Sequence, residues 1–188
     1  MPLSPRFSDA LVYAFELHLE QTRKVAKTPY IGHLLEVAGI VLEYGANEDE
    51  AIAALLHDAI EDQGGASRRE EIGQRFGPAV AEIVDGCTDA ETRPKPPWRP
   101  RKEAFLGRLR QASASVRLVV AADKLQNVRS LVREYRLRGE SLWEHFGAGP
   151  DAVRWYYRAI VGILQREQST PLVEELERAV VELERLTA

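Results

Sequence analysis

Four side chains that can bind metals or transfer protons lie within six residues of one apolar segment. The residues before them, 51–56, are all aliphatic, which predicts a helix that is buried nearly all round. The segment then carries His57, Asp58, Glu61 and Asp62. This helix is expected to continue until just before Gly64. Asp58 then shares a face with Glu61 and Asp62, because residues three and four positions apart are neighbours on a helix. Unpaired charges are costly in such a segment, so we expect these side chains to surround a cation.

Two other segments could complete a metal site. His33 lies in the first turn of a helix predicted to begin at Ile31. Asp123 interrupts the apolar residues 119–122, and Asn127 follows one turn later. Two imidazoles and two carboxylates suit a transition metal better than calcium, and the residues alone leave manganese, iron and zinc open. The predicted metal ligands are His33, His57, Asp58 and Asp123.

Each of these residues also has an ordinary structural explanation. Taken alone, His33 could be a histidine satisfied by hydrogen bonds at a helix end, and Asp123 could form a buried ion pair with an arginine. Glu61 and Asp62 could be a solvated helix terminus, although acids at a helix C-terminus oppose the macrodipole. Asn127 could do no more than hydrogen-bond a carboxylate or a backbone group. The occurrence of the whole set in one chain favours a site.

Length and composition narrow the class of protein. A chain of 188 residues with 45% hydrophobic content predicts one domain over residues 1–188, large enough for a real core. The net charge of −4, without a long Lys/Arg stripe, argues against a nucleic-acid partner. No signal sequence or long apolar stretch is present, which argues against export and a membrane span. Cys87 is the only cysteine, so no internal disulfide forms. A cytoplasmic protein with Cys87 in a packing role is expected.

Apolar periodicity and helix boundary signals predict a nearly all-α chain. A first helix is indicated by the spacing of Leu11, Phe15, His18 and Leu19. Asn47 and Glu50 form a capping-box pattern for the His-Asp helix, and Ser67 with Glu70 resembles a cap for a shorter one. The other predicted helices span 31–44, 78–84, 101–111, 116–137, 151–167 and 171–186. The expected fold is a bundle of about eight to nine helices, with its core in residues 7–165 and a C-terminal helix at 171–186.

A proline-rich segment, 91–100, predicts an extended loop before the helix that carries Arg101 and Lys102. The loop and the start of this helix contain Arg93, Lys95, Trp98, Arg99, Arg101 and Lys102. These side chains could bind phosphates and stack on a base, or form a solvated linker. The aromatic residues 155–157 lie in the middle of a predicted helix, where packing is the usual role. One of them could also contact a ligand.

The motifs together resemble those of the HD-domain phosphohydrolases, and within that superfamily the stand-alone (p)ppGpp hydrolases of RelA/SpoT type. The matching segments are Arg23-Lys24, TPYIGH at 28–33, HDAIED at 57–62, TD at 88–89 and ADKLQN at 122–127. The resemblance covers residues 7–165. Gly32 stands where the family usually has asparagine, and Leu34 where it usually has proline. Both flank His33, so these departures concern substrate contacts there more than metal binding.

This resemblance implies an HD-domain helical bundle and assigns roles to individual residues. His33, His57, Asp58 and Asp123 match the family's metal ligands, and the metal there is usually Mn²⁺, with Zn²⁺, Fe²⁺ or Co²⁺ as alternatives. Glu61 and Asp62 match the pair that positions or deprotonates the attacking water and assists the leaving oxygen. The positions where the family holds its nucleotide are Arg23, Lys24, Arg101, Lys102, Asn127 and Tyr156.

The implied activity is hydrolysis of the 3′-pyrophosphate of a nucleotide alarmone, (p)ppGpp or (p)ppApp. The products would be pyrophosphate and GDP or GTP, or the adenine equivalents. Two alternatives stay open: an HD-type 5′-nucleotidase or NADPH phosphatase with the same metal site, and a non-catalytic alarmone-binding protein. The expected partner is a small-molecule nucleotide, and a homo-oligomer is compatible with the sequence.

Overall fold

A computed structural model describes residues 2–90 and 94–187 of the chain. Within these residues the fold is all-α, as predicted, and the only β-type pairing is an isolated bridge between Thr22 and Pro29. The elements are α1 (Pro5–Leu17), α2 (Ile31–Glu43), α3 (Glu48–Leu56), α4 (Ala59–Gln63), α5 (Ala66–Phe76), α6 (Pro78–Cys87), α7 (Trp98–Leu109), α8 (Ala114–Arg138), the 3₁₀ helix η1 (Gly139–His145), α9 (Pro150–Glu167) and α10 (Pro171–Leu186). None of the described helices is long and apolar enough to cross a membrane.

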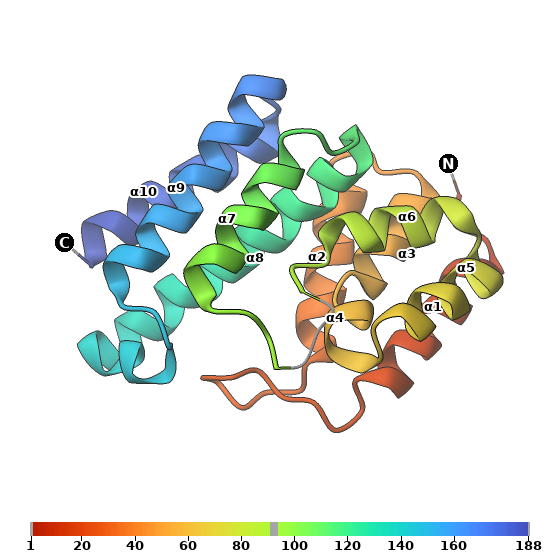
Figure 1. The fold of residues 1–188 in the computed structure, drawn as a ribbon, viewed down its shortest axis with the longest axis horizontal. Helices are drawn as coiled ribbons and strands as arrows, with labels where there is room; N and C mark the ends of the chain where they lie inside the picture. The colour runs from red at the N-terminus through yellow and green to blue at the C-terminus, as the bar shows by residue number, and fades with distance from the viewer. Residues whose placement is uncertain (1, 91–93, 188) are drawn as a thin grey trace.

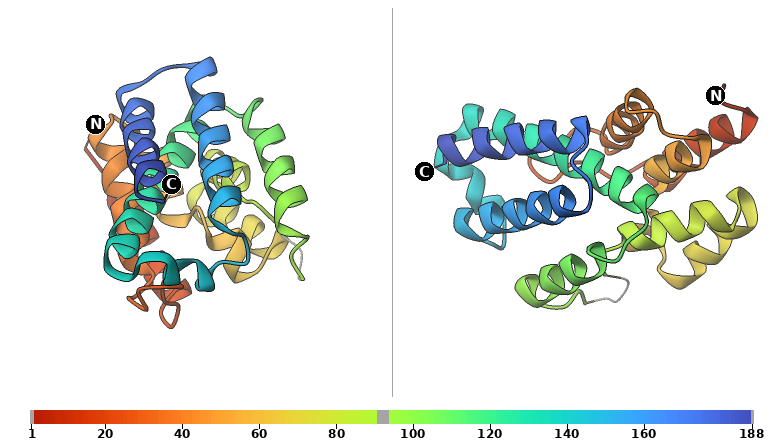
Figure 2. Two further views of the ribbon diagram at one scale, coloured as in Figure 1. Left: turned by 90° about the vertical axis from the view of Figure 1, so that its left-hand side faces the viewer. Right: turned by 90° about the horizontal axis from the view of Figure 1, so that it is seen from above.

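The long helix α8 runs through the middle of the molecule (Figures 1 and 2). On one side it packs against α2, α3 and α6, and on the other against α10 and α9. Helix α3 is fully buried from Ala51 to Leu56, because it lies between α1, α2, α6 and α8. This burial explains why its sequence is apolar on every face. The metal-site candidates lie at the C-terminal end of α3, where its apolar run stops.

The predicted continuous His-Asp helix is interrupted, and this part of the prediction was wrong. The capping box of Asn47 and Glu50 opens α3 as expected, but the helix ends at Leu56. The imidazole Nδ1 of His57 lies 2.8 Å from the Ala54 carbonyl oxygen, a backbone group that the next helical turn would otherwise use. A separate helix, α4, then carries Glu61 and Asp62 in its first turn. The macrodipole therefore favours these acids, contrary to the expected helix C-terminus.

Two helix boundaries also differ from the prediction. Gly65, not Ser67, is the N-cap residue of α5, and the Ser67 hydroxyl donates to the Gly64 carbonyl oxygen. Helix α7 begins at Trp98, inside the predicted loop, because the Trp98 ring packs against Trp155 and Tyr156 on α9. Helix α1 forms as predicted and buries Ala10, Tyr13 and Ala14, whereas Phe15 and Leu19, which helped to indicate it, are exposed. Arg93 lies outside the described residues.

Candidate metal centre and active site

Two buried histidines from different helices face each other at the end of α3. His33 comes from the first turn of α2, and His57 caps the C-terminus of α3. Their ring centroids are 5.1 Å apart in an edge-to-face arrangement. The side chains are only 1% and 2% exposed, so neither ring is held there by contact with water.

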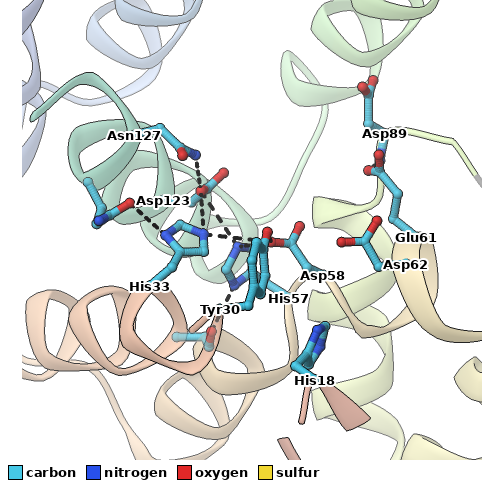
Figure 3. Close-up of polar contacts among 12 residues, drawn as sticks. His18, Tyr30, His33, His57, Asp58, Glu61, Asp62, Asp89, Asp123 and Asn127 are labelled. Atoms are coloured by element: carbon cyan, nitrogen blue, oxygen red, sulfur yellow. Dashed lines mark hydrogen bonds and ion pairs between the residues drawn. The ribbon is translucent and has the colours of Figure 1, made fainter. Parts of the chain in front are cut away.

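Two carboxylates complete the cluster (Figure 3). An oxygen of Asp58 lies 3.0 Å from Nε2 of His57 and 3.6 Å from Nε2 of His33. An oxygen of Asp123, from the middle of α8, lies 3.4 Å from the His33 nitrogen and 3.6 Å from the His57 nitrogen. The ligand atoms of His33, His57 and Asp58 are mutually close enough to bind a single ion. Asp123 borders the same space through its contacts with both imidazoles.

The hydrogen bonds around the histidines fix which nitrogen faces the cluster. Nδ1 of His33 lies 2.6 Å from Oε1 of Gln126, and Nδ1 of His57 lies 2.8 Å from the Ala54 carbonyl. Both partners are acceptors, so both Nδ1 atoms carry the proton when the rings are neutral. The Nε2 atoms are then bare, and both are buried without a hydrogen-bond partner. Histidines oriented by a second hydrogen bond in this way are typical metal ligands, so these residues fit a divalent transition metal.

The charges of the cluster are strongly coupled when no cation is bound. Burial disfavours the charged form of His57, but Asp58 and Asp123 outweigh it and raise the His57 pKa well above its usual value. Burial likewise opposes ionisation of the two aspartates, and the neighbouring cationic groups nevertheless hold the pKa of each carboxyl well below its usual range. For Asp123 the main partner is Lys124, whose Nζ lies 2.5 Å from Oδ2. The site is therefore built to hold positive charge.

Residues that sequence reasoning did not assign to the site support these ligands. The Tyr30 hydroxyl donates to Asp58 at 2.6 Å. Gln126 is buried, accepts from His33 and donates to Glu36 at 2.7 Å, which fixes the orientation of its amide. Tyr30 and Gln126 lie within the two motifs that contain His33 and Asp123. Their position in these motifs is the only feature of the sequence that could have identified them as residues of the site.

Glu61 and Asp62 lie on the far side of Asp58 from His33 (Figure 3). Glu61 accepts from the backbone N–H of Asp89 at 3.1 Å and from Lys95 Nζ at 2.6 Å. Asp62 accepts from Gln21 at 2.8 Å and lies 3.6 Å from the same lysine. Burial lowers the Lys95 pKa, but Glu61 and Asp62 overcompensate and raise it. Both acids are partly exposed, at 15% and 23%, so a ligand can reach them.

The predicted phosphate-binding residues divide into two groups. Arg101 and Lys102 both pair with Asp89, Lys102 at 2.7 Å, and Arg101 also lies 3.9 Å from Glu61. Tyr156 belongs with this group because its ring lies 4.6 Å from Lys102 Nζ. Burial, followed by repulsion from Lys124, lowers the Lys102 pKa. Asp89 is thus the centre of a compact ion-pair cluster that the sequence did not indicate.

The other group surrounds a pocket on the opposite side of the metal centre. Arg23 donates to Asn127 at 2.8 Å and lies 3.4 Å from the Gln126 oxygen. A pocket of about 240 Å³ opens here, and it is lined by Arg23, Lys24, Val25, Ala26, Tyr30, Asn127, Ser130, Leu131, Glu134, Phe146 and Tyr157. Tyr157 rather than Tyr156 reaches it. Of the six predicted nucleotide contacts, Arg23, Lys24 and Asn127 line this pocket, whereas Arg101, Lys102 and Tyr156 do not.

Comparisons with known proteins agree with this geometry. A family model described as an HD domain matches residues 10–152. Guanosine-3′,5′-bis(diphosphate) 3′-pyrophosphohydrolase MESH1 of Xenopus tropicalis is 42% identical over 128 residues, which cover 66% of this chain and 69% of that protein. The protein of the same name from Drosophila melanogaster is 34% identical over 131 residues, or 68% and 70% of the two chains.

A solved structure shows the same architecture over the whole chain. It is described as a metazoan ortholog of SpoT that hydrolyzes ppGpp and plays a role in starvation responses. It superposes with a TM-score of 0.79 at 26% sequence identity, and the match covers 100% of this chain and 99% of the other. The comparisons confirm the resemblance that the motifs indicated.

Proposed function

The chain belongs to the HD-domain family, and from this premise we propose that it hydrolyses the 3′-pyrophosphate of a nucleotide alarmone such as (p)ppGpp or (p)ppApp. The products are pyrophosphate and GDP or GTP, or the adenine equivalents. The observation that carries the proposal is the cluster of His33, His57 and Asp58 beside the acids Glu61 and Asp62. Two relatives that match about two thirds of the chain are named for this reaction, and a solved structure that matches all of it is described as hydrolyzing ppGpp.

We propose that His33, His57, Asp58 and Asp123 hold one divalent metal, Mn²⁺ in the first place, with Zn²⁺, Fe²⁺ or Co²⁺ as alternatives. Mixed imidazole and carboxylate donors suit all of these ions. The bare Nε2 atoms of the two histidines support the assignment. When bound, such an ion supplies Lewis-acid chemistry, which makes water more acidic and stabilises charge on phosphate oxygens.

Glu61 and Asp62 are assigned the proton transfers. Each carboxylate is oriented by a fixed donor, Glu61 by the Asp89 backbone and Asp62 by Gln21. One of the pair positions the water that attacks the phosphorus bonded to the 3′-oxygen and accepts its proton. The other delivers a proton to the departing 3′-oxygen. Oriented carboxylates next to the reacting atoms are the standard requirement for general acid–base catalysis.

The two cation groups are assigned to the phosphates and the nucleoside. The pocket of Arg23, Lys24 and Asn127 adjoins the metal centre, since Asn127 also donates to Asp123. Its volume of about 240 Å³ suits a nucleoside. Arg101 and Lys102 lie beside Glu61 on the other side, where they can form charge-assisted hydrogen bonds to phosphate oxygens.

We also propose that the enzyme acts on this small molecule in the cytoplasm, without a nucleic-acid partner. A single cysteine and a net charge of −4 support both points.

A product assay tests the proposed function. Purified protein loaded with Mn²⁺ is offered ppGpp, ppApp, NADPH and simple 5′-monophosphates side by side. We expect pyrophosphate from the first two at a much higher kcat/KM than orthophosphate from the others. Preferential release of orthophosphate from a 5′-monophosphate or NADPH would overturn the proposal in favour of the nucleotidase or phosphatase alternative.

A further inference from the structure

The nucleoside pocket extends from the metal centre along one face of α8. Its wall on this helix consists of Asn127, Ser130, Leu131 and Glu134. Residues at such spacings share a helix face, and Asp123 lies one turn before Asn127 on the same face. At about 1.5 Å of rise per residue, Glu134 lies about 16 Å along the axis from Asp123. The pocket therefore has a metal end and a distal end, and Glu134 lies at the distal end.

Glu134 is the one acidic residue among the described residues that line this pocket. Its side chain is only 7% exposed, and charged residues are rarely buried unless they are paired. Arg138 Nε donates to Oε2 at 3.0 Å, whereas Arg133 Nε stays 3.7 Å from Oε1. Each carboxylate oxygen can accept two hydrogen bonds, so both oxygens keep capacity for a ligand. The two arginines fix the carboxylate, and their own side chains extend into solvent.

The other walls of the pocket suit a flat aromatic ring. Phe146 lines it, and Lys24 Nζ lies 5.4 Å from the centroid of the Phe146 ring. Leu131 adds apolar surface. Bases stack on aromatic side chains and on cations in such surroundings. In a purine nucleotide with a 3′-phosphate, the 3′-phosphate and the base lie at opposite ends. The 3′-phosphate can therefore lie at the metal end of the pocket while the base lies at the distal end.

We infer that Glu134 recognises the base of the substrate and selects guanine over adenine, an inference that rests on the proposed function. Guanine presents two adjacent donors, N1–H and the 2-amino group, which match the two oxygens of a carboxylate. Adenine presents an acceptor, N1, beside its 6-amino group. The lone pair on N1 would face a carboxylate oxygen without a proton between them, which is unfavourable. Glu134 thus selects guanine both by attraction and by repulsion of the competing base.

The substitution Glu134→Gln tests this assignment because the amide offers one acceptor and one donor, the pattern that adenine matches. For the wild-type protein loaded with Mn²⁺, we expect kcat/KM for ppGpp to exceed that for ppApp by about tenfold or more, the effect of a good bidentate pair. In Glu134→Gln the ratio should fall by about tenfold or reverse, mainly through KM. Glu134→Asp keeps the negative charge but, because its side chain is shorter, moves the carboxylate away from the base. It should weaken the guanine preference without favouring adenine.

Glu182→Gln is the matched control, since Glu182 also pairs with an arginine of α8 but does not line this pocket. It should leave the ratio unchanged. If the wild type hydrolyses both alarmones and Glu134→Gln and Glu134→Asp keep its guanine-to-adenine ratio, the inference is wrong while the proposed function stands. If the protein hydrolyses neither, the proposed function fails.

In that case the inference about Glu134 is tested separately, by calorimetric measurement of GDP and ADP binding to the wild type and to Glu134→Gln. A GDP-to-ADP affinity ratio that is the same in both proteins would overturn the inference. A shift of this ratio towards ADP in Glu134→Gln would support it.

Discussion

Two pairs of adjacent cations flank the metal centre, and their surroundings differ. Arg101 and Lys102 are neutralised by Asp89, with Glu61 next to them. Arg23 instead donates to the neutral amides of Asn127 and Gln126, and the Lys24 side chain is exposed at the mouth of a pocket. Among the described residues, neither Arg23 nor Lys24 has a carboxylate within ion-pair distance. One pair belongs to an internal network, and the other pair keeps its charge available.

The two pairs show that a cation can be available for an anionic ligand with or without an acidic partner inside the protein. An uncommitted cation attracts an anion at no internal cost, although it is screened by solvent. A cation already paired with a buried acid is held in place, but an incoming phosphate must share it with that acid. Lys102 therefore has a structural role that Lys24 lacks. Substitutions at the metal centre and in the two pairs should separate these contributions.

Removal of a metal ligand should have the largest effect, because both pairs serve a common centre. Asp58→Ala or His57→Ala should reduce activity to background and strip most of the metal, while the protein stays folded on its large core. Elemental analysis and circular dichroism measure the two properties. Asp151→Ala, at an exposed aspartate of α9, is the control. Metal content equal to wild type in both ligand variants would refute the proposed shell.

Substitution of the acid pair should lower turnover without removing the metal. Glu61→Gln and Asp62→Asn should each reduce kcat by ~10²-fold or more, the usual loss when a positioned acid or base is removed. Metal occupancy should persist because neither side chain is needed to fill the shell. Steady-state kinetics on protein of verified metal content provides the measurement. A variant that keeps near-wild-type kcat would exclude that residue from the mechanism.

The comparison of the two cation pairs can be tested directly with Lys24→Ala and Lys102→Ala. Both should raise KM for ppGpp by roughly tenfold, because a charge-assisted hydrogen bond contributes ~1.5–3 kcal/mol. Only Lys102→Ala should also lower Tm, since it leaves Asp89, a largely buried acid, with one cation fewer. Kinetics and calorimetry measure both properties. Equal Tm values for the two variants would mean that the structural distinction between the pairs is wrong.

The smallest effect concerns the proton on His57. Burial alone would lower its pKa, but Asp58 and Asp123 raise the pKa well above the usual value in the metal-free protein. The interaction of protonated His57 with Asp58 and Asp123 therefore stabilises the metal-free fold. Its contribution is fully present below about pH 6.5 and is lost as the pH rises through the raised His57 pKa. A metal needs the neutral imidazole, so loading at pH 7 should release about one proton. Calorimetry in buffers of different ionisation enthalpy measures this, and a buffer-independent heat would contradict it.

Much of the fold could be predicted because the signals were local. The capping box at Asn47 and the proline that opens α10 determine helix starts without help from the rest of the chain. The break between α3 and α4 could not be predicted, because it depends on a bond between the His57 side chain and the Ala54 carbonyl. The start of α7 was also missed, since Trp98 stabilises it through contact with distant aromatic residues of α9.

The candidate site shows the same division. His33, His57, Asp58 and Asp123 were predicted to converge because charged groups in apolar helices must find partners, and the structure brings them together. The pairing of Arg101 and Lys102 with Asp89 was not predictable, because no sequence pattern states which acid a cation meets after folding. Tyr156 was placed among the nucleotide contacts from the resemblance to the family, yet only the fold decides that Tyr157 reaches the pocket.

The proposed site cleaves a 3′-pyrophosphate by attack of water on the phosphorus bonded to the 3′-oxygen. Hydrolysis of ppGpp in water enriched in heavy oxygen, followed by phosphorus NMR and mass spectrometry, tests it most directly. We expect pyrophosphate that carries the heavy isotope, unlabelled GDP, and loss of the reaction on chelation with recovery on adding Mn²⁺. Orthophosphate as the product, label in the nucleotide, or turnover that survives complete removal of the metal would contradict it.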